Sequence, residues 1–311
     1  MATAQTDRWP AIPAADWQGT RDTLQLYTQV VGKVRLANEP HANHWWNTTM
    51  YLTSRGLTTS PMPHPTGPSF QIDLDLVDHR LDVTTVSGGR RSLDLVPRSV
   101  ADFHAAVMSL LDELGVGTDI WPVPVEIPGA IPFPDDTVHA SYDADAVHRF
   151  WLALVDIERV VKRFRARFLG KASPIHLFWG ALDLAHTRFS GRTAPPYEGE
   201  VPNCGPHVMR EAYSHEVSSC GFWPGAPGEE GTFYAYAYPE PPGYRDAPVE
   251  PEGARWDGDL GEFVLPYEVV RTAPDPDAAL LAFLQSTYEG AADAAGWDRA
   301  ALERPSGDRF A

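Results

Sequence analysis

Apolar and polar positions along the chain repeat one order of elements, a helix followed by strands and a second helix. Between residues 17 and 36, apolar side chains recur at the three- and four-residue spacing of a helix. Residues 70–78 alternate instead, with Phe70, Ile72 and Leu74 on one face and Gln71 and Asp73 on the other. Strict alternation is typical of an antiparallel sheet that buries one face. Further strands are predicted at 45–54, 81–86 and 91–96, the last two flanking a turn at Gly88 and Gly89.

A helix is predicted to close this first half. Ser99 has the side chain of an N-cap, apolar residues form a stripe between 100 and 114, and Gly115 is a suitable stop. The proline-rich segment WPVPVEIPGAIPFP follows within residues 117–142. Because proline fixes φ and donates no backbone hydrogen bond, we expect an extended connector here.

The same order of elements returns after the connector. A strongly amphipathic helix is predicted from its cap Asp143 to the stop at Gly170. Strands are predicted at 174–189, 213–222, 232–238 and 260–265. A last helix begins at Asp275 and Pro276 and runs to about residue 294.

The sequence therefore predicts an α+β protein, built as two similar helix–antiparallel sheet–helix halves in a pseudo-duplicated architecture. The first half spans residues 8–116, the connector 117–142 and the longer second half 143–300. Glycine- and proline-rich insertions lengthen the second half, and loops of that length often carry function. We expect the junction between the halves to form the ligand cleft.

Composition narrows the classes of partner. The chain has 25 Lys and Arg against 42 Asp and Glu, a net charge of −17. Because a chain with this negative charge repels phosphate backbones and anionic lipid, we expect neither a nucleic-acid nor a membrane partner. Two cysteines cannot form a disulfide framework, and the N-terminus lacks a secretory pattern, so a cytoplasmic location is expected. No nucleotide, metalloprotease, nucleophile-elbow or CxxC motif is present, so no cofactor is indicated.

One hypothesis is an enzyme that acts on a small polar or anionic metabolite. Alternation along 174–189 puts His176, His186 and Arg188 on one face of the predicted strand. An arginine can hold an anionic group while a neighbouring imidazole transfers a proton. In this hypothesis the candidate catalytic residues are His176 or His215 as acid and base, Arg188 as anion ligand, and Asp183 or Glu216 as the group that orients an imidazole. The structural alternative is a salt-bridged arginine and ordinary cross-strand histidines.

A second hypothesis is a non-catalytic binding or interaction module with an aromatic-lined pocket. The strand TFYAYAY places its tyrosines on one face, and tryptophans concentrate in EPHANHWWN. Such side chains can line a pocket, although they also pack in cores. The candidate ligand-binding residues are His44, Trp45, Trp46, Arg55, Trp179, His186, Arg192, Tyr234 and Tyr236.

A metal site is the third alternative. Cys204, His207, His215 and Cys220 offer two thiolates and two imidazoles, a set that zinc accepts tetrahedrally. Their spacing, C-x2-H-x7-H-x4-C, matches no standard zinc finger.

The segments VGKVRLANEPHANHWWNTTMYLTSRGLTT, SPIHLFWGALDLAHTRFSGR and EAYSHEVSSCGFWPG resemble those of an uncharacterised bacterial family, a domain of unknown function. The resemblance covers about residues 8–304. It implies a bacterial cytosolic protein, and it carries over no activity, cofactor or site residue.

Overall fold

The computed structural model describes residues 8–226 and 228–305. The first sheet has five antiparallel strands in the order β1-β2-β3-β4-β5. They are β1 (Tyr51–Leu52), β2 (Gly56–Thr58), β3 (Phe70–Asp75), β4 (Arg80–Thr85) and β5 (Arg90–Asp94). Around them lie α1 (Ala14–Asn38), the short 3-10 helix η1 (Asn43–Trp45) and α2 (Val100–Glu113).

The second sheet has six antiparallel strands in the order β10-β11-β9-β8-β7-β6. They are β6 (His176–Phe178), β7 (Asp183–Thr193), β8 (His215–Trp223), β9 (Thr232–Tyr238), β10 (Arg255–Asp257) and β11 (Glu262–Pro266). The helices of this part are η2 (Phe133–Asp135), α3 (Ala144–Ala166), α4 (Pro206–Ala212), η3 (Tyr244–Asp246), α5 (Tyr267–Arg271), α6 (Pro276–Ala294) and α7 (Arg299–Leu302).

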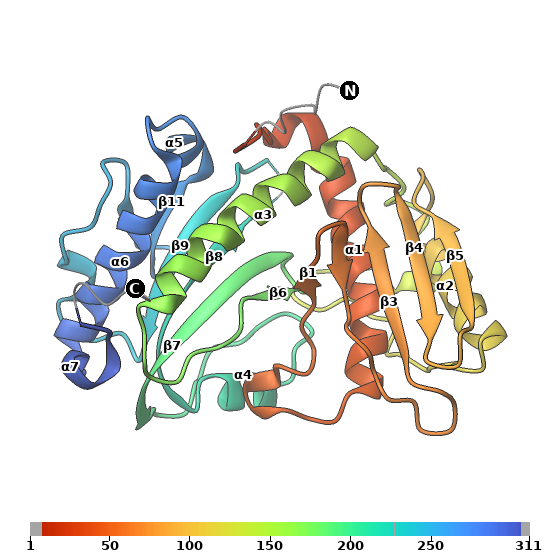
Figure 1. The fold of residues 1–311 in the computed structure, drawn as a ribbon, viewed down its shortest axis with the longest axis horizontal. Coiled ribbons are helices and arrows are strands. Elements are labelled where there is room, and N and C mark those ends of the chain that lie inside the picture. The colour runs from red at the N-terminus through yellow and green to blue at the C-terminus, as the bar shows by residue number, and fades with distance from the viewer. Residues whose placement is uncertain (1–7, 227, 306–311) are drawn as a thin grey trace.

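The predicted α+β class, with two antiparallel sheets and their helices, is confirmed (Figure 1). The two sheets meet at their edges, where the backbones of Met50 and Leu177 exchange two hydrogen bonds of 3.0 and 2.9 Å. The predicted division into two sheet–helix halves is compatible with this arrangement. The half with the first sheet contains α1 and α2, and the half with the second sheet contains α3 and α6. Residues of both halves nevertheless share one hydrophobic cluster.

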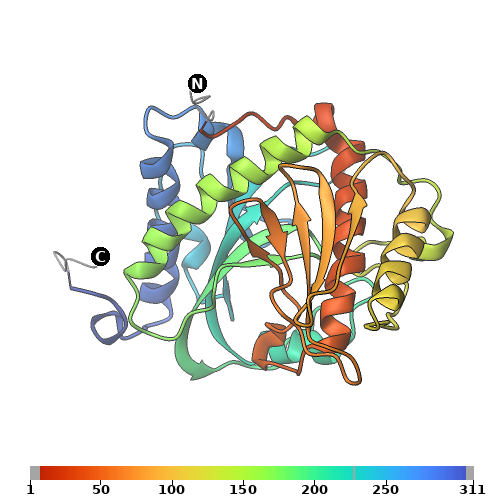
Figure 2. The ribbon, with the colours of Figure 1, turned by 45° about the vertical axis from the view of Figure 1, so that its right-hand side comes forward.

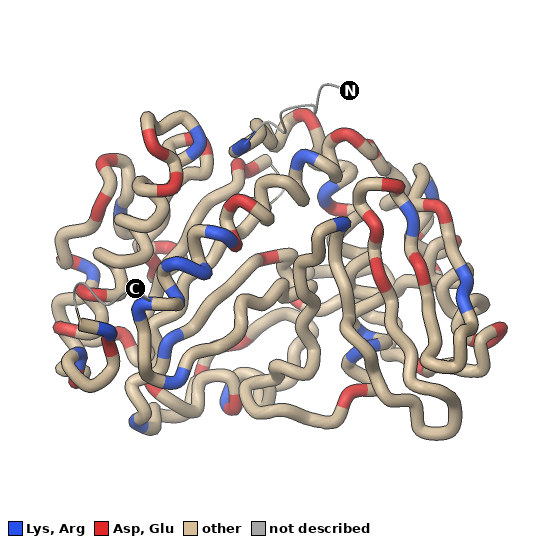
Figure 3. The backbone as a smooth tube through the Cα atoms, in the orientation of Figure 1, with Lys and Arg blue, Asp and Glu red and all other residues tan. Residues whose placement is uncertain are grey.

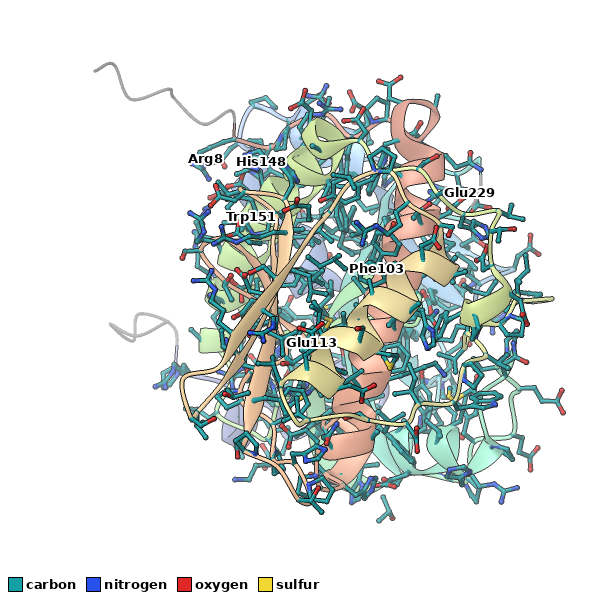
Figure 4. All side chains as sticks on the ribbon, turned by 90° about the vertical axis from the view of Figure 1, so that its right-hand side faces the viewer. Arg8, Phe103, Glu113, His148, Trp151 and Glu229 are labelled. Atoms are coloured by element: carbon teal, nitrogen blue, oxygen red, sulfur yellow. The ribbon has the colours of Figure 1, made fainter. Side chains whose placement is uncertain are left out.

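The long helices pack against one another across that cluster. Trp17 of α1 and Phe150 of α3 lie with ring centroids 4.9 Å apart where the two helices cross (Figure 2). Tyr27 of α1 stacks on Phe103 of α2 at 3.8 Å, and Figure 4 shows α2 crossing in front of α1 at this level. Ser99 and Asp143 cap α2 and α3 as predicted, each accepting a backbone N–H three residues on.

Two predicted strands are shorter in the structure. Residues 43–49 form η1 and a turn, in which the hydroxyls of Thr48 and Thr49 donate to the carbonyls of Trp45 and Trp46, so the predicted 45–54 strand contracts to β1. The predicted 174–189 strand is two antiparallel strands, β6 and β7, reversed by a turn at 179–182. In this antiparallel pairing His176 lies opposite Ala185. His176 is therefore on the other face of the sheet from His186 and Arg188, with which it was predicted to share a face.

Charged side chains gather on the outer surface. Figure 3 shows Lys and Arg along the C-terminal half of α3, acidic residues on β3 and both signs of charge on β4 and β5. Arg8, Arg159 and Arg163 converge on Asp277 of α6, an ion-pair network that holds the pKa of this carboxyl well below its usual range. Among the described residues, no helix is long and apolar enough to cross a bilayer.

Candidate functional site

A cavity of about 630 Å³ lies against one face of the second sheet. Its floor is formed by β7, β8 and β9, and its other walls are α1, η1, the connector and the segment leading through α4. Both halves of the chain thus contribute to it. The volume is in the range of pockets that enclose a small organic molecule.

Strand alternation determines which side chains reach the floor. Asp183 and Thr187 of β7, Ser219 of β8, and Tyr234 and Tyr236 of β9 all point to this face. Tyr234 lies directly over Gly221, where a Cβ atom would come within 2.5 Å of the tyrosine hydroxyl. A glycine at this position of β8 is therefore what allows the tyrosine to lie flat across the sheet.

Four tryptophans, Trp45, Trp46, Trp121 and Trp179, line the walls. The Trp179 ring packs against Gly32 of α1, and its indole N–H donates to the carbonyl of Thr48 at 2.5 Å. Trp46 contacts His44, whose ring centroid is 5.3 Å away. The rings give the cavity a mainly apolar surface with a few polar groups, as is typical of small-molecule sites.

The connector is fixed in the cavity wall by Gln29 of α1. The amide of this fully buried side chain donates to the carbonyls of Val125 and Gly180 and accepts the N–H of Val125. Asn203 supports the same segment from the other side by donating to the carbonyls of Pro124 and Ile127. The predicted connector is therefore part of the site as well as a link between halves.

We expect the Gln29→Leu substitution to lower the free energy of unfolding by about 2 kcal/mol, because the backbone groups of Val125 would lose their partners. Gln25→Leu is the matched control. Gln25 donates only to the Gly180 carbonyl, which would keep its bond from Gln29, so a loss below about 1 kcal/mol is expected. Urea denaturation of both variants checks this, and equal losses would contradict the assigned role of Gln29.

Two carboxyl groups line the cavity. Asp183 accepts a hydrogen bond of 2.6 Å from the Tyr234 hydroxyl, and burial raises its pKa to about 6. Glu126, from the connector, lies over Gly180, and its carboxylate has no hydrogen-bond or ion-pair partner among the described residues. Glu126 is an exposed residue, and its partial desolvation beside the cavity wall, followed by the charge of Asp183, raises its pKa to about 7. Both groups therefore titrate closer to neutral pH than ordinary carboxyls.

Lys33 of α1 is the one lysine or arginine among the described residues that line the cavity. Only 4% of its surface is exposed, and burial lowers the pKa of its ammonium to about 8. No hydrogen bond or ion pair reaches it from any described residue. The ammonium instead lies 4.6 Å from the centroid of the Trp121 ring, a cation–π contact.

Backbone strain concentrates around the cavity. Eight described residues other than glycine have a positive φ, and four of them, His44, Trp45, Glu126 and Asn203, line it. A fifth, Leu182 with φ of 62°, directly precedes Asp183. Each such residue costs of order 1–3 kcal/mol and persists only where its surroundings enforce it. Residues of this kind often cluster at functional sites, which supports this cavity as the site.

Seven of the predicted catalytic and ligand-binding residues line the cavity. They are His44, Trp45, Trp46, Trp179, Asp183, Tyr234 and Tyr236. Most of the proposed aromatic pocket is therefore brought together at one place.

The proposed imidazole–guanidinium group is not brought together there. His186 and Arg188 lie on the opposite face of β7, where the Arg188 guanidinium stacks 3.5 Å from the Phe164 ring centroid. His176 is on the cavity side but is covered by Trp46, and its Nδ1 lies 2.9 Å from the Thr49 hydroxyl. All three are 1% exposed, and none of them lines the cavity.

The remaining predicted residues lie at the edge of the cavity or form ion pairs outside it. His215 contacts His44, with ring centroids 5.6 Å apart, just outside the lining. Glu216 forms an ion pair with Arg192, and Arg55 pairs with Asp75 in the first sheet.

The candidate metal ligands also separate. Cys204 and His207 line the cavity, but Cys220 lies on the far face of the sheet, where its thiol donates to the backbone carbonyl of His186. Within residues 8–226 and 228–305, no three His, Cys, Asp or Glu side chains are placed to hold a metal.

Lys33, Glu126, Trp121 and Tyr213 also line the cavity and were not predicted. Two signals were present. Glu126 is the only charged residue between 120 and 134, inside an otherwise apolar, proline-rich run. Lys33 interrupts the apolar segment VVGKV in the middle of a helix. A lone charge among apolar residues is costly when it is buried, as Lys33 is, unless another group compensates it.

The fold and the cavity together define an α+β protein with one aromatic-walled pocket that also contains unpaired charges. The model of a family of unknown function, DUF5996, matches residues 9–304, nearly the whole chain, and the protein belongs to this family. Neither the curated proteins nor the solved structures give a match.

Proposed function

We propose that this protein binds a small organic molecule with an apolar or aromatic body in the 630 Å³ cavity. The single observation that carries the proposal is the convergence of four tryptophans, from η1, its following turn, the connector and the β6–β7 turn, on one cavity. Rings brought from such distant segments usually fill a core. Here they leave a void large enough for a ligand.

A library of small aromatic and alicyclic compounds, screened by quenching of tryptophan fluorescence, tests this function. We expect saturable binding of at least one chemical class. The Ala212→Trp substitution places an indole at the cavity wall and should weaken that binding at least about tenfold, the effect of losing about 1.4 kcal/mol of contact.

The same substitution at exposed Ala294 on α6, which is outside this cavity, is the matched control and should leave affinity unchanged. Equal binding by both variants would place the ligand elsewhere. Absence of saturable binding in the wild type would contradict the proposal.

Acid–base catalysis at the same cavity is the second candidate. The observation that favours it is the pair of cavity carboxyls whose pKa values are raised, to about 6 for Asp183 and about 7 for Glu126. A group that titrates near the working pH is suited to transfer protons. Mass spectrometry of each ligand recovered after incubation tests it, and an unchanged mass for every ligand would leave binding alone.

We also propose a cytoplasmic location. Cys204 and Cys220 are both free thiols, as expected in a reducing compartment. Fractionation of the native host would test it.

A further inference from the structure

We propose that the ligand of this cavity carries two opposite charges, an anionic group bound by Lys33 at one end and a cationic group bound by Glu126 and Asp183 at the other. This inference rests on the proposed binding function and specifies the chemical class of ligand.

The anionic end follows from the isolation of Lys33. A buried ammonium is strongly unfavourable unless an anion or hydrogen-bond acceptors compensate it. The described residues supply neither to Lys33, whose ammonium lies against the faces of Trp121, at 4.6 Å, and Phe133, at 6.0 Å. Because the side chain lines the cavity, a carboxylate or similar group of a ligand could complete the missing pair there.

The cationic end follows from the two carboxyls. Glu126 has no partner for its carboxylate, and Asp183 has a single one, the Tyr234 hydroxyl. The charge on Asp183 raises the pKa of Glu126, so the two groups interact unfavourably when both are ionised. An organic ammonium would relieve this repulsion and would find aromatic faces around it, which favour cations.

The two ends are separated. No ion pair joins Lys33 to Glu126, although both line the same cavity. Glu126 lies over Gly180, whose carbonyl is bound by Gln29, and Lys33 is four residues beyond Gln29 on α1. That spacing is about one helical turn, roughly 5–6 Å. The class of ligand that we propose is therefore a zwitterion with separated charges, such as an ω-amino acid.

Titration calorimetry at pH 7.5 tests the assignment with three matched probes. They are 4-(aminomethyl)benzoate, which carries both charges, 4-methylbenzoate, which has only the anion, and 4-methylbenzylamine, which has only the cation. A flexible set, 6-aminohexanoate with hexanoate and hexylamine, repeats the comparison. We expect at least one zwitterion to bind about tenfold or more tightly than both of its counterparts, because it makes one charged hydrogen bond more than either of them.

Variants assign each end. Lys33→Met should weaken binding of the zwitterion and of the carboxylate probe about tenfold and leave binding of the amine probe unchanged. Glu126→Gln should weaken binding of the zwitterion and of the amine probe and leave binding of the carboxylate probe unchanged. Lys162→Met, at an exposed lysine of α3, is the control and should change no affinity.

If neither zwitterion binds more tightly than its singly charged counterparts, or if the two variants affect all probes alike, the two-charge assignment is wrong. The proposed binding function still holds after that result if a neutral compound binds and Ala212→Trp lowers its affinity. If no compound shows this loss of affinity, both proposals are wrong.

Discussion

Replacing Lys33 by methionine is expected to raise the free energy of unfolding by about 3 kcal/mol at pH 7. The pKa of the ammonium falls from 10.5 to about 8 in the folded protein, and each pKa unit corresponds to about 1.4 kcal/mol. At pH 7 the folded chain must therefore keep a charge that the unfolded chain hydrates freely. Methionine has a similar length and fills the same space without a charge.

The pH dependence identifies the cause. Between pH 8 and 10.5 the unfolded state binds more protons at this lysine than the folded state does, so the wild type gains stability as pH rises. The advantage of Lys33→Met should shrink to below about 1 kcal/mol by pH 10.5. Tyrosine ionisation affects both proteins, so their difference isolates Lys33.

Urea denaturation of the wild type and the variant at pH 7 and pH 10.5 measures both effects. Lys162→Met is the control, because this lysine is 63% exposed, and its change should stay within about 0.5 kcal/mol. A destabilised Lys33→Met protein, or a difference independent of pH, would show that the lysine is satisfied in the folded state.

The largest acid sensitivity is expected from His176 and His186. Burial lowers the pKa of each from 6.5 to about 3. Between these values the unfolded state binds more protons, so stability is lost as pH falls below 6.5. At pH 5 the loss is about 2 kcal/mol for each histidine, or about 4 kcal/mol together.

The cavity carboxyls act in the opposite direction over part of this range. Their raised pKa values mean that the folded state takes up protons first, so Asp183 and Glu126 add stability as pH falls. The acid response of the whole protein is a sum, and only variants separate its parts.

The measurement is therefore the change in unfolding free energy between pH 7.5 and pH 5 in the wild type, His176→Leu, His186→Leu and the double variant. Each substitution should remove about 2 kcal/mol of that change. Val161→Ala, a buried substitution without a titratable group, should lower stability at both pH values and leave the change as it is. A double variant with the wild-type pH response would rule out buried neutral histidines.

Local signals made much of the fold predictable. Ser99, Asp143 and Asp275 cap their helices through the backbone N–H three residues on, a contact that depends only on nearby sequence. The alternation in 70–78 and the glycine turn before β5 are equally local. These features determined the predicted α+β class.

The site was less predictable because it depends on long-range contacts. Alternation separates the faces of a strand but does not say which face a helix covers. α3 and α6 cover the side of His186 and Arg188, where Arg188 lies 3.5 Å from Phe164 and 4.2 Å from Tyr288, and the cavity lies on the side of Asp183. Glu126 reaches that cavity on a connector held by long-range contacts, from Gln29, 96 residues from Val125 in sequence, and from Asn203.

The pairing of Met50 with Leu177 has a consequence for self-association. Strand edges are templates for the addition of other chains, and this contact joins the inner edges of both sheets to each other. The outermost strands that remain are β5, with exposed Arg90 and Arg91, and β10, with exposed Arg255. Both remaining edges are short and charged, β5 with five residues and β10 with three, and such strands are poor templates for another chain, so the architecture limits edge-to-edge aggregation.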